Sequence, residues 1–151
     1  MSVPPMVRQS EIIQELSTLL PERVPGEWVE LVFTERSLSM YGQGEMRAKR
    51  PDGSWESVRA PRSKNDLLEE LRSLMYQPGC GTWFSTTWRV TKTPSGESAV
   101  DITFNYDDEP DWSRPIRAFN YVLDLEDFPR DEEHIPAWLR KKVAEGKGEA
   151  Q

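Results

Sequence analysis

The residues best suited to chemistry are a lone histidine and a lone cysteine. His134 follows Glu132 and Glu133, either of which could orient its imidazole for acid–base catalysis. A surface histidine near the start of a helix is the simpler interpretation, and we favour it. Cys80 lies between two glycines, and no basic residue adjoins it to activate the thiol. We therefore expect a small residue in a tight turn, and no catalytic residues.

Residues 107–112, Asp-Asp-Glu-Pro-Asp-Trp, gather four acids around a proline. A calcium loop needs alternating ligands, a central glycine and a terminal glutamate, and this segment lacks both the glycine and the spacing. Gly42-Gln43-Gly44 lacks the third glycine and the following helix of a phosphate-binding loop. The sequence has no serine elbow, cysteine pair or Walker loop. We predict no specific metal site, no cofactor and no enzymatic activity.

The excess negative charge of the chain lies in one stretch. Residues 1–96 are neutral, residues 97–133 carry a net charge of −9, and residues 134–151 carry +2. Such a stretch either keeps the surface solvated or docks a basic partner. In the second case, the charges increase the on-rate and the specificity of binding. Our candidate partner-binding residues are Asp107, Asp108, Glu109, Asp111 and Trp112. Trp112 would be the aromatic anchor; the alternative is that it folds back as a lid on the sheet.

Composition limits the class of protein further. A chain of 151 residues with six tryptophans fits one domain with a packed core. No apolar run approaches a membrane span, and the first six residues lack the pattern of a secretory signal. A single cysteine fits a reducing cytosol. The acidic pI of about 4.9 disfavours direct binding to nucleic acid or to an anionic membrane.

Hydrophobic periodicity and turn signals predict an order of elements. A first helix should begin at a Ser10 cap and stop at Pro21, and a second should be capped by Ser63. Residues 115–125 are ambiguous, and residues 128–139 look like a short closing helix. The strands are expected at Trp28–Thr34, Ser37–Tyr41 with a continuation to Lys49, Ser54–Val58, and a hairpin of Thr82–Thr91 and Glu97–Tyr106.

Alternation along that hairpin assigns its faces. The apolar side holds Phe84, Trp88 and Val90, and the opposite side is polar, with Trp83 as an exposed candidate. We predict an α+β domain over residues 1–140, an antiparallel sheet with two main helices on one face and a short C-terminal helix, and a flexible charged tail at 141–151. The expected core is Leu16, Leu31, Phe33, Leu71, Leu74, Phe84, Trp88, Ile102 and Phe104.

Two segments resemble the YezG-like immunity proteins of bacterial polymorphic toxin systems. One is Gly-Thr-Trp-Phe-Ser-Thr-Thr at 81–87, which leads into Val-Asp-Ile-Thr-Phe-Asn-Tyr-Asp at 100–107. The other is the ending Phe-Pro-Arg-Asp-Glu-Glu-His-Ile-Pro-Ala-Trp-Leu at 128–139, which is similar to that of the actinobacterial branch. The resemblance runs from about Glu11 to Leu139. Neither segment is a catalytic motif.

The resemblance implies a small cytoplasmic antitoxin that binds and occludes a secreted toxin, either a nuclease or an NAD-cleaving enzyme. It transfers no catalytic residue and no contact residue. An acidic face suits the basic groove of a nuclease. Two alternatives stay open: an acidic adaptor protein without a toxin, and a small hydrolase that uses an aspartate and His134. The oligomeric state does not follow from the sequence.

Overall fold

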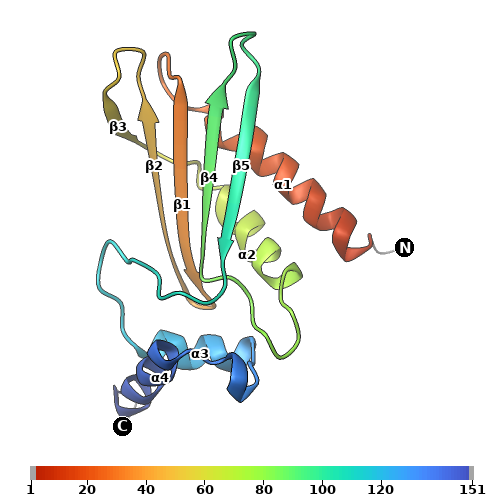
Figure 1. The fold of residues 1–151 in the computed structure, drawn as a ribbon, viewed down its shortest axis with the longest axis vertical. Coiled ribbons are helices and arrows are strands. Elements are labelled where there is room, and N and C mark those ends of the chain that lie inside the picture. Colours follow the sequence, from red (N-terminus) through yellow and green to blue (C-terminus); the bar gives the residue numbers. More distant parts are fainter. Residues whose placement is uncertain (1–2, 150–151) are drawn as a thin grey trace. The chain divides into compact units, whose positions relative to one another are not determined.

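A helix opens the chain and a five-stranded antiparallel sheet follows (Figure 1). The computed structural model describes residues 3–149. The strand order is β3-β2-β1-β4-β5, and the predicted α+β class is confirmed. The elements are α1 Pro5–Glu22, β1 Glu30–Leu38, β2 Tyr41–Lys49, β3 Trp55–Val58, α2 Lys64–Leu74, β4 Ser85–Lys92, β5 Ser98–Asn105, α3 Phe119–Asp127, the 3-10 turn η1 Glu132–His134, and α4 Ala137–Glu149.

The residues group into two compact units. Unit 1 comprises residues 3–34, 44–75 and 87–103, and unit 2 comprises residues 35–43, 76–86 and 104–149. Four strands (β1, β2, β4 and β5) continue from one unit into the other. None of the described helices is long and apolar enough to cross a membrane.

In unit 1, α1 and α2 pack on each other, and in Figure 1 both emerge from behind β4 and β5 toward the right of the view. The Lys64 ammonium, at the start of α2, lies 5.4 Å from the centre of the Phe33 ring on β1. A second apolar cluster joins the strands to the chain before β1. Its buried members are Trp28, Leu31, Ala48 and Val90. The prediction of two helices on one face of the sheet is confirmed.

The helix starts differ from the prediction. Ser10 lies inside α1, which begins at Pro5 because proline suits the first helical position. Ser63 does precede α2, but it makes no side-chain capping bond. Its backbone is already helical, because a turn in which Lys64 N–H donates to the Pro61 carbonyl leads into the helix.

The predicted faces of the hairpin are confirmed for β4. The prediction was wrong for the residue that precedes β4. Trp88 and Phe84 are 0% and 1% exposed, whereas Phe104 is half-buried because β5 is an edge strand with one neighbour. Trp83, expected to be exposed, is fully buried and lies 5.8 Å from the Phe104 ring. Alternation fails at Trp83 because this residue precedes β4. Among the other expected core residues, the buried ones are Leu16, Leu31, Phe33 and Leu71, and the half-buried ones are Leu74 and Ile102.

The C-terminal segment expected to fray from Lys141 is helical to Glu149. Gly146 is buried, and a Cβ atom there would lie 2.6 Å from the Ala118 carbonyl oxygen. The absence of a side chain at Gly146 therefore allows α4 to approach α3 closely. The Glu149 carboxylate accepts hydrogen bonds from the N–H groups of Ala118 and Phe119, both at 3.2 Å, and caps α3.

Candidate partner-binding surface

The acidic loop, residues 107–112, follows β5 in unit 2. Its four carboxylate residues are exposed, and Pro110 between them is buried. The Asp107 side chain is 79% exposed. A buried proline beneath exposed acids implies a loop that lies against the protein while its charges face solvent.

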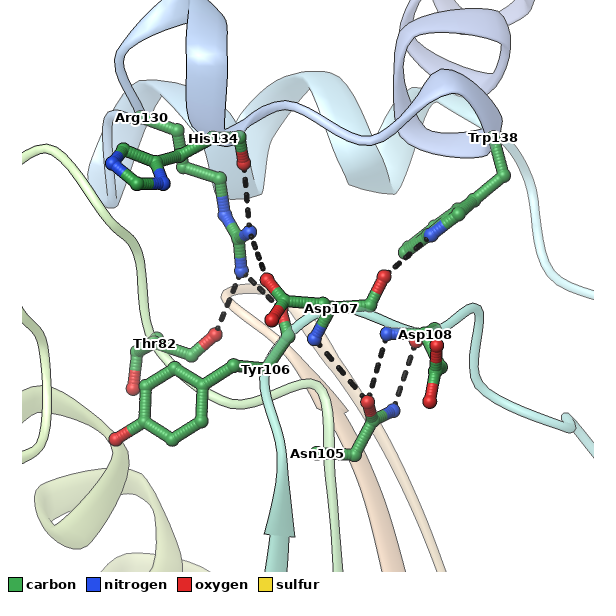
Figure 2. A network of polar contacts seen from close by, with 8 residues as sticks. All are labelled: Thr82, Asn105, Tyr106, Asp107, Asp108, Arg130, His134 and Trp138. Atoms are coloured by element: carbon green, nitrogen blue, oxygen red, sulfur yellow. Dashed lines mark hydrogen bonds and ion pairs between the residues drawn. The ribbon is translucent and has the colours of Figure 1, made fainter.

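Asn105, the last residue of β5, organises the first half of this loop (Figure 2). Its side-chain oxygen accepts from Asp108 N–H at 2.8 Å and from Asp107 N–H at 3.3 Å. Its amide nitrogen donates to the Asp108 carbonyl at 2.9 Å and to Ser85 Oγ at 3.0 Å. One amide side chain thus fixes two loop residues to the end of the sheet, as in an Asx turn.

Arg130 lies beneath the loop, with its side chain 2% exposed. The guanidinium donates to the carbonyls of Tyr106 at 2.6 Å, His134 at 3.0 Å and Thr82 at 3.2 Å, and lies 3.5 Å from the Asp107 carboxylate. It also lies over the Phe84 ring, 4.7 Å from its centre. The planar fork of arginine can satisfy this many acceptors at once, which a lysine could not.

Two glycines make room for this arginine segment. Gly81 has a φ of +98°, and a Cβ atom there would overlap the Arg130 guanidinium. Gly79 has a φ of +78°, and a Cβ atom there would overlap the Asp131 carboxylate. The backbone between them carries Cys80, which is half-buried. The glycines around the cysteine therefore serve the fit of Arg130 and Asp131.

Helix α4 secures the loop from its other side. The Trp138 indole N–H donates to the Asp107 carbonyl at 2.8 Å, and its ring packs edge-on against Phe84 and Tyr121. The Lys142 ammonium lies 3.7 Å from the Glu109 carboxylate. For Asp108 and Asp111, the described residues offer no such ion pair. The loop backbone is held by neutral donors, and two of its four carboxylates have no ion pair within the described residues.

Trp112 adopts the alternative position that the sequence left open. It is half-buried and packs on the cluster of Leu38, Phe84, Tyr121 and Leu139. Its indole N–H donates to the Tyr121 hydroxyl at 2.9 Å, and its ring lies 5.7 Å from Tyr41. Burial raises the pKa of Tyr121 to about 12. Trp112 is thus a lid on unit 2, and its contact with a partner stays a prediction.

A buried glutamine holds the chain just after Trp112. Gln43 on β2 accepts from Ser113 N–H at 2.9 Å and donates to the Arg114 carbonyl at 2.9 Å. Its side chain also donates to the Tyr41 hydroxyl at 3.0 Å. Both ends of the acidic loop are therefore tied to strands of the sheet.

The other sequence candidates do not assemble into a catalytic group. The His134 imidazole is exposed, points away from the acidic loop in Figure 2, and lies 3.8 Å from the Glu133 carboxylate. Only its backbone carbonyl joins the Arg130 network. Within residues 3–149, no group of three or more histidine, cysteine, aspartate or glutamate side chains is placed to hold a metal ion.

Sequence reasoning missed Arg130, because a buried arginine in a loop belongs to no periodic pattern. It also missed two hollows in unit 1. An acidic groove of about 670 Å³ lies along α1 and α2, lined by Glu11, Gln14, Glu15, Thr18, Leu19, Glu22, Ser63 and Leu67. A smaller hollow of about 270 Å³ is lined by Arg23, Arg59, Ala60, Pro61 and Arg62. Each combines residues far apart in sequence.

We compared the chain with family models and with curated proteins. No family model matches the chain, and no curated protein matches its sequence.

Proposed function

We propose that this chain is an immunity protein that binds a cognate secreted toxin through the acidic loop and occludes the toxin's active site. The proposed setting is the cytoplasm of the bacterium that produces the toxin. The observation that carries the proposal is an acidic surface on a fixed backbone. Asn105, Arg130 and Trp138 hold the loop while the carboxylates of Asp107 and its neighbours face solvent.

The physical reasons are pre-organisation and steering. A surface that is ordered before binding loses less conformational entropy when the complex forms. Clustered like charges speed the encounter with a basic partner and disfavour wrong partners. A nuclease needs a basic groove for its phosphate-rich substrate, so it is the toxin class that this surface fits best. For an NAD-cleaving toxin, the inhibitor would have to plug a nucleotide cleft, and charge would matter less.

The test uses the protein encoded beside this gene as the candidate toxin. One variant neutralises the loop with Asp107→Asn, Asp108→Asn, Glu109→Gln and Asp111→Asn. The matched control removes the same number of exposed acids elsewhere, at Glu69, Glu126, Asp127 and Glu133. Surface plasmon resonance should show a slower on-rate for the loop variant alone, with the difference shrinking at high salt. Equal on-rates for the loop variant and the parent at low salt would place the interface elsewhere.

An assay of cell protection distinguishes inhibition of the toxin by binding from an enzymatic activity of this protein. His134→Ala and Cys80→Ser should leave protection against the toxin within about threefold of the parent, since neither side chain joins a catalytic arrangement. Loss of protection with unchanged folding and toxin binding would instead support the hydrolase alternative. An adaptor without a toxin is the outcome if the neighbouring protein neither binds nor harms cells.

A further inference from the structure

The smaller hollow of unit 1, here called the arginine hollow, consists of Arg23, Arg59, Ala60, Pro61 and Arg62. Arg23 follows the last turn of α1, and the other four residues form the connection from β3 to α2. Three of its five lining residues carry a positive charge at every physiological pH. Pro61 is buried and Ala60 is half-buried, so the hollow also has an apolar wall.

No carboxylate among residues 3–149 forms an ion pair with these three arginines. Acids outnumber bases by 26 to 19, and other arginines of unit 1 use them. Arg8 lies 2.7 Å from Glu70, and Arg50 lies 2.7 Å from Glu56. Among residues 3–149, no hydrogen bond or ion pair engages the side chains of Arg23, Arg59 and Arg62. Their positive charges are therefore not offset by an ion pair within the described part of the chain.

The helix ends beside the hollow affect its arginines in different ways. A cation after the last turn of α1 interacts favourably with the helix dipole, which accounts for Arg23. The same effect works against Arg62, which stands just before the N-terminus of α2. Ser63 makes no side-chain capping bond there, and Asp66 in the first turn of α2 offsets part of the positive charge of the helix start.

We propose that the arginine hollow binds the phosphoryl group of a small molecule, or free phosphate. Guanidinium groups match the oxygens of a phosphate with paired hydrogen bonds. Three cations exceed the charge of one carboxylate and suit a phosphate dianion. At about 270 Å³, the hollow is just below the usual size of a ligand pocket, which favours a single anionic group with a small substituent.

The backbone of the hollow is set before any ligand arrives. The Pro61 carbonyl accepts from Lys64 N–H at 3.2 Å, and the Arg62 carbonyl accepts from Asn65 N–H at 3.0 Å. The Pro21 carbonyl accepts from Val24 N–H at 3.3 Å beside Arg23. On binding, the three arginine side chains need to become ordered, whereas the backbone adds little further ordering cost.

The test titrates the full chain with inorganic phosphate, ribose 5-phosphate and succinate by calorimetry at constant ionic strength. The phosphate probes should bind saturably at one per chain, and succinate should not. Arg23→Gln, Arg59→Gln and Arg62→Gln should each weaken phosphate binding by about tenfold. The control Arg47→Gln, an exposed arginine stacked 5.4 Å over Trp55, should leave the affinity unchanged. Circular dichroism checks that each variant is folded.

The two phosphate probes distinguish a phosphorylated metabolite from free phosphate as the ligand of the hollow. Tighter binding of ribose 5-phosphate assigns the hollow to a phosphorylated metabolite, and equal binding assigns it to free phosphate; both support the proposal. Absence of saturable binding by either probe overturns it. So does equal binding of succinate, or an equal loss of affinity in Arg47→Gln, because either would show unspecific attraction to positive charge.

Discussion

The acidic loop of unit 2 and the arginine hollow of unit 1 both concentrate like charges, but only the loop has a counter-charge built beneath it. Arg130 is buried under the loop and is bonded to three carbonyls and a carboxylate. The described residues place no carboxylate against the guanidinium groups of the hollow. Exposed acids on a fixed loop suit a protein partner, and a small hollow with cations that have no ion pair suits a small anion. The sign of the charge alone does not distinguish the two proposed functions. The groups that hold each site in place and the shape of each site do.

The largest expected effect comes from removing the cation under the loop. Arg130→Met should destabilise the protein by about 3 kcal/mol, because the carbonyls of Tyr106, Thr82 and His134 lose their donors. Urea unfolding measures this change. Arg117→Met removes a guanidinium that is 77% exposed and should cost less than about 0.5 kcal/mol. Equal costs for the two variants would show that the loop does not depend on Arg130.

Gly81→Ala should cost about 2 kcal/mol, since it combines backbone strain at positive φ with a clash against the Arg130 guanidinium. Gly53→Ala is the matched control, because Gly53 has a φ of +90° and nothing within 4 Å of its added Cβ. The difference between the two midpoints in a urea titration isolates the clash. No difference would mean that Arg130 moves aside freely.

Trp112→Phe should lower the free energy of unfolding by about 1 kcal/mol, because the Tyr121 hydroxyl loses its donor. If Trp112 is only a lid, the off-rate of the toxin stays unchanged. If it is an anchor of the complex, the off-rate rises by an amount worth about 2 kcal/mol or more. Urea unfolding and surface plasmon resonance on the same variant therefore separate the two roles.

The smallest effect at neutral pH comes from the Tyr121 hydroxyl. Burial raises the pKa of Tyr121 from about 10 to about 12, so folding favours the neutral phenol. The stabilisation is complete below pH 10 and is lost as pH rises from about 10 to about 12. Denaturation midpoints across that window should fall more steeply for the parent than for Tyr121→Phe. Parallel pH profiles would contradict a buried, protonated Tyr121.

Features that depend on residues close together in the sequence could be predicted, and features that depend on distant residues could not. The hairpin, the buried face at Trp88 and the acidic loop follow from local alternation and composition. The burial of Trp83 does not, because that residue lies outside β4 and its partner Phe104 is brought in by strand pairing. Alternation describes only residues within a strand.

The support of the acidic loop was hidden for the same reason. Asn105 is adjacent in sequence, and its Asx turn follows a familiar local pattern. Arg130 and Trp138 come from a distant segment, and nothing in their own neighbourhoods marks them as partners of the loop. The arginine hollow is similar, since Arg23 meets Arg59 and Arg62 only after α1 and the β3–α2 connection pack in unit 1.

The strand order has a consequence for how the chain acquires its structure. β1 lies between β2, its immediate successor, and β4, which follows only after a further strand and helix. Bonds at the two ends of the β1–β4 pair, Ser37 N–H to the Phe84 carbonyl and Lys92 N–H to the Val29 carbonyl, close a long stretch of chain. During synthesis, the β1–β2–β3 meander emerges with one side of β1 unsatisfied until β4 leaves the ribosome. The centre of the sheet therefore cannot close before β4 has been synthesised, and an open, association-prone edge of β1 is exposed until then.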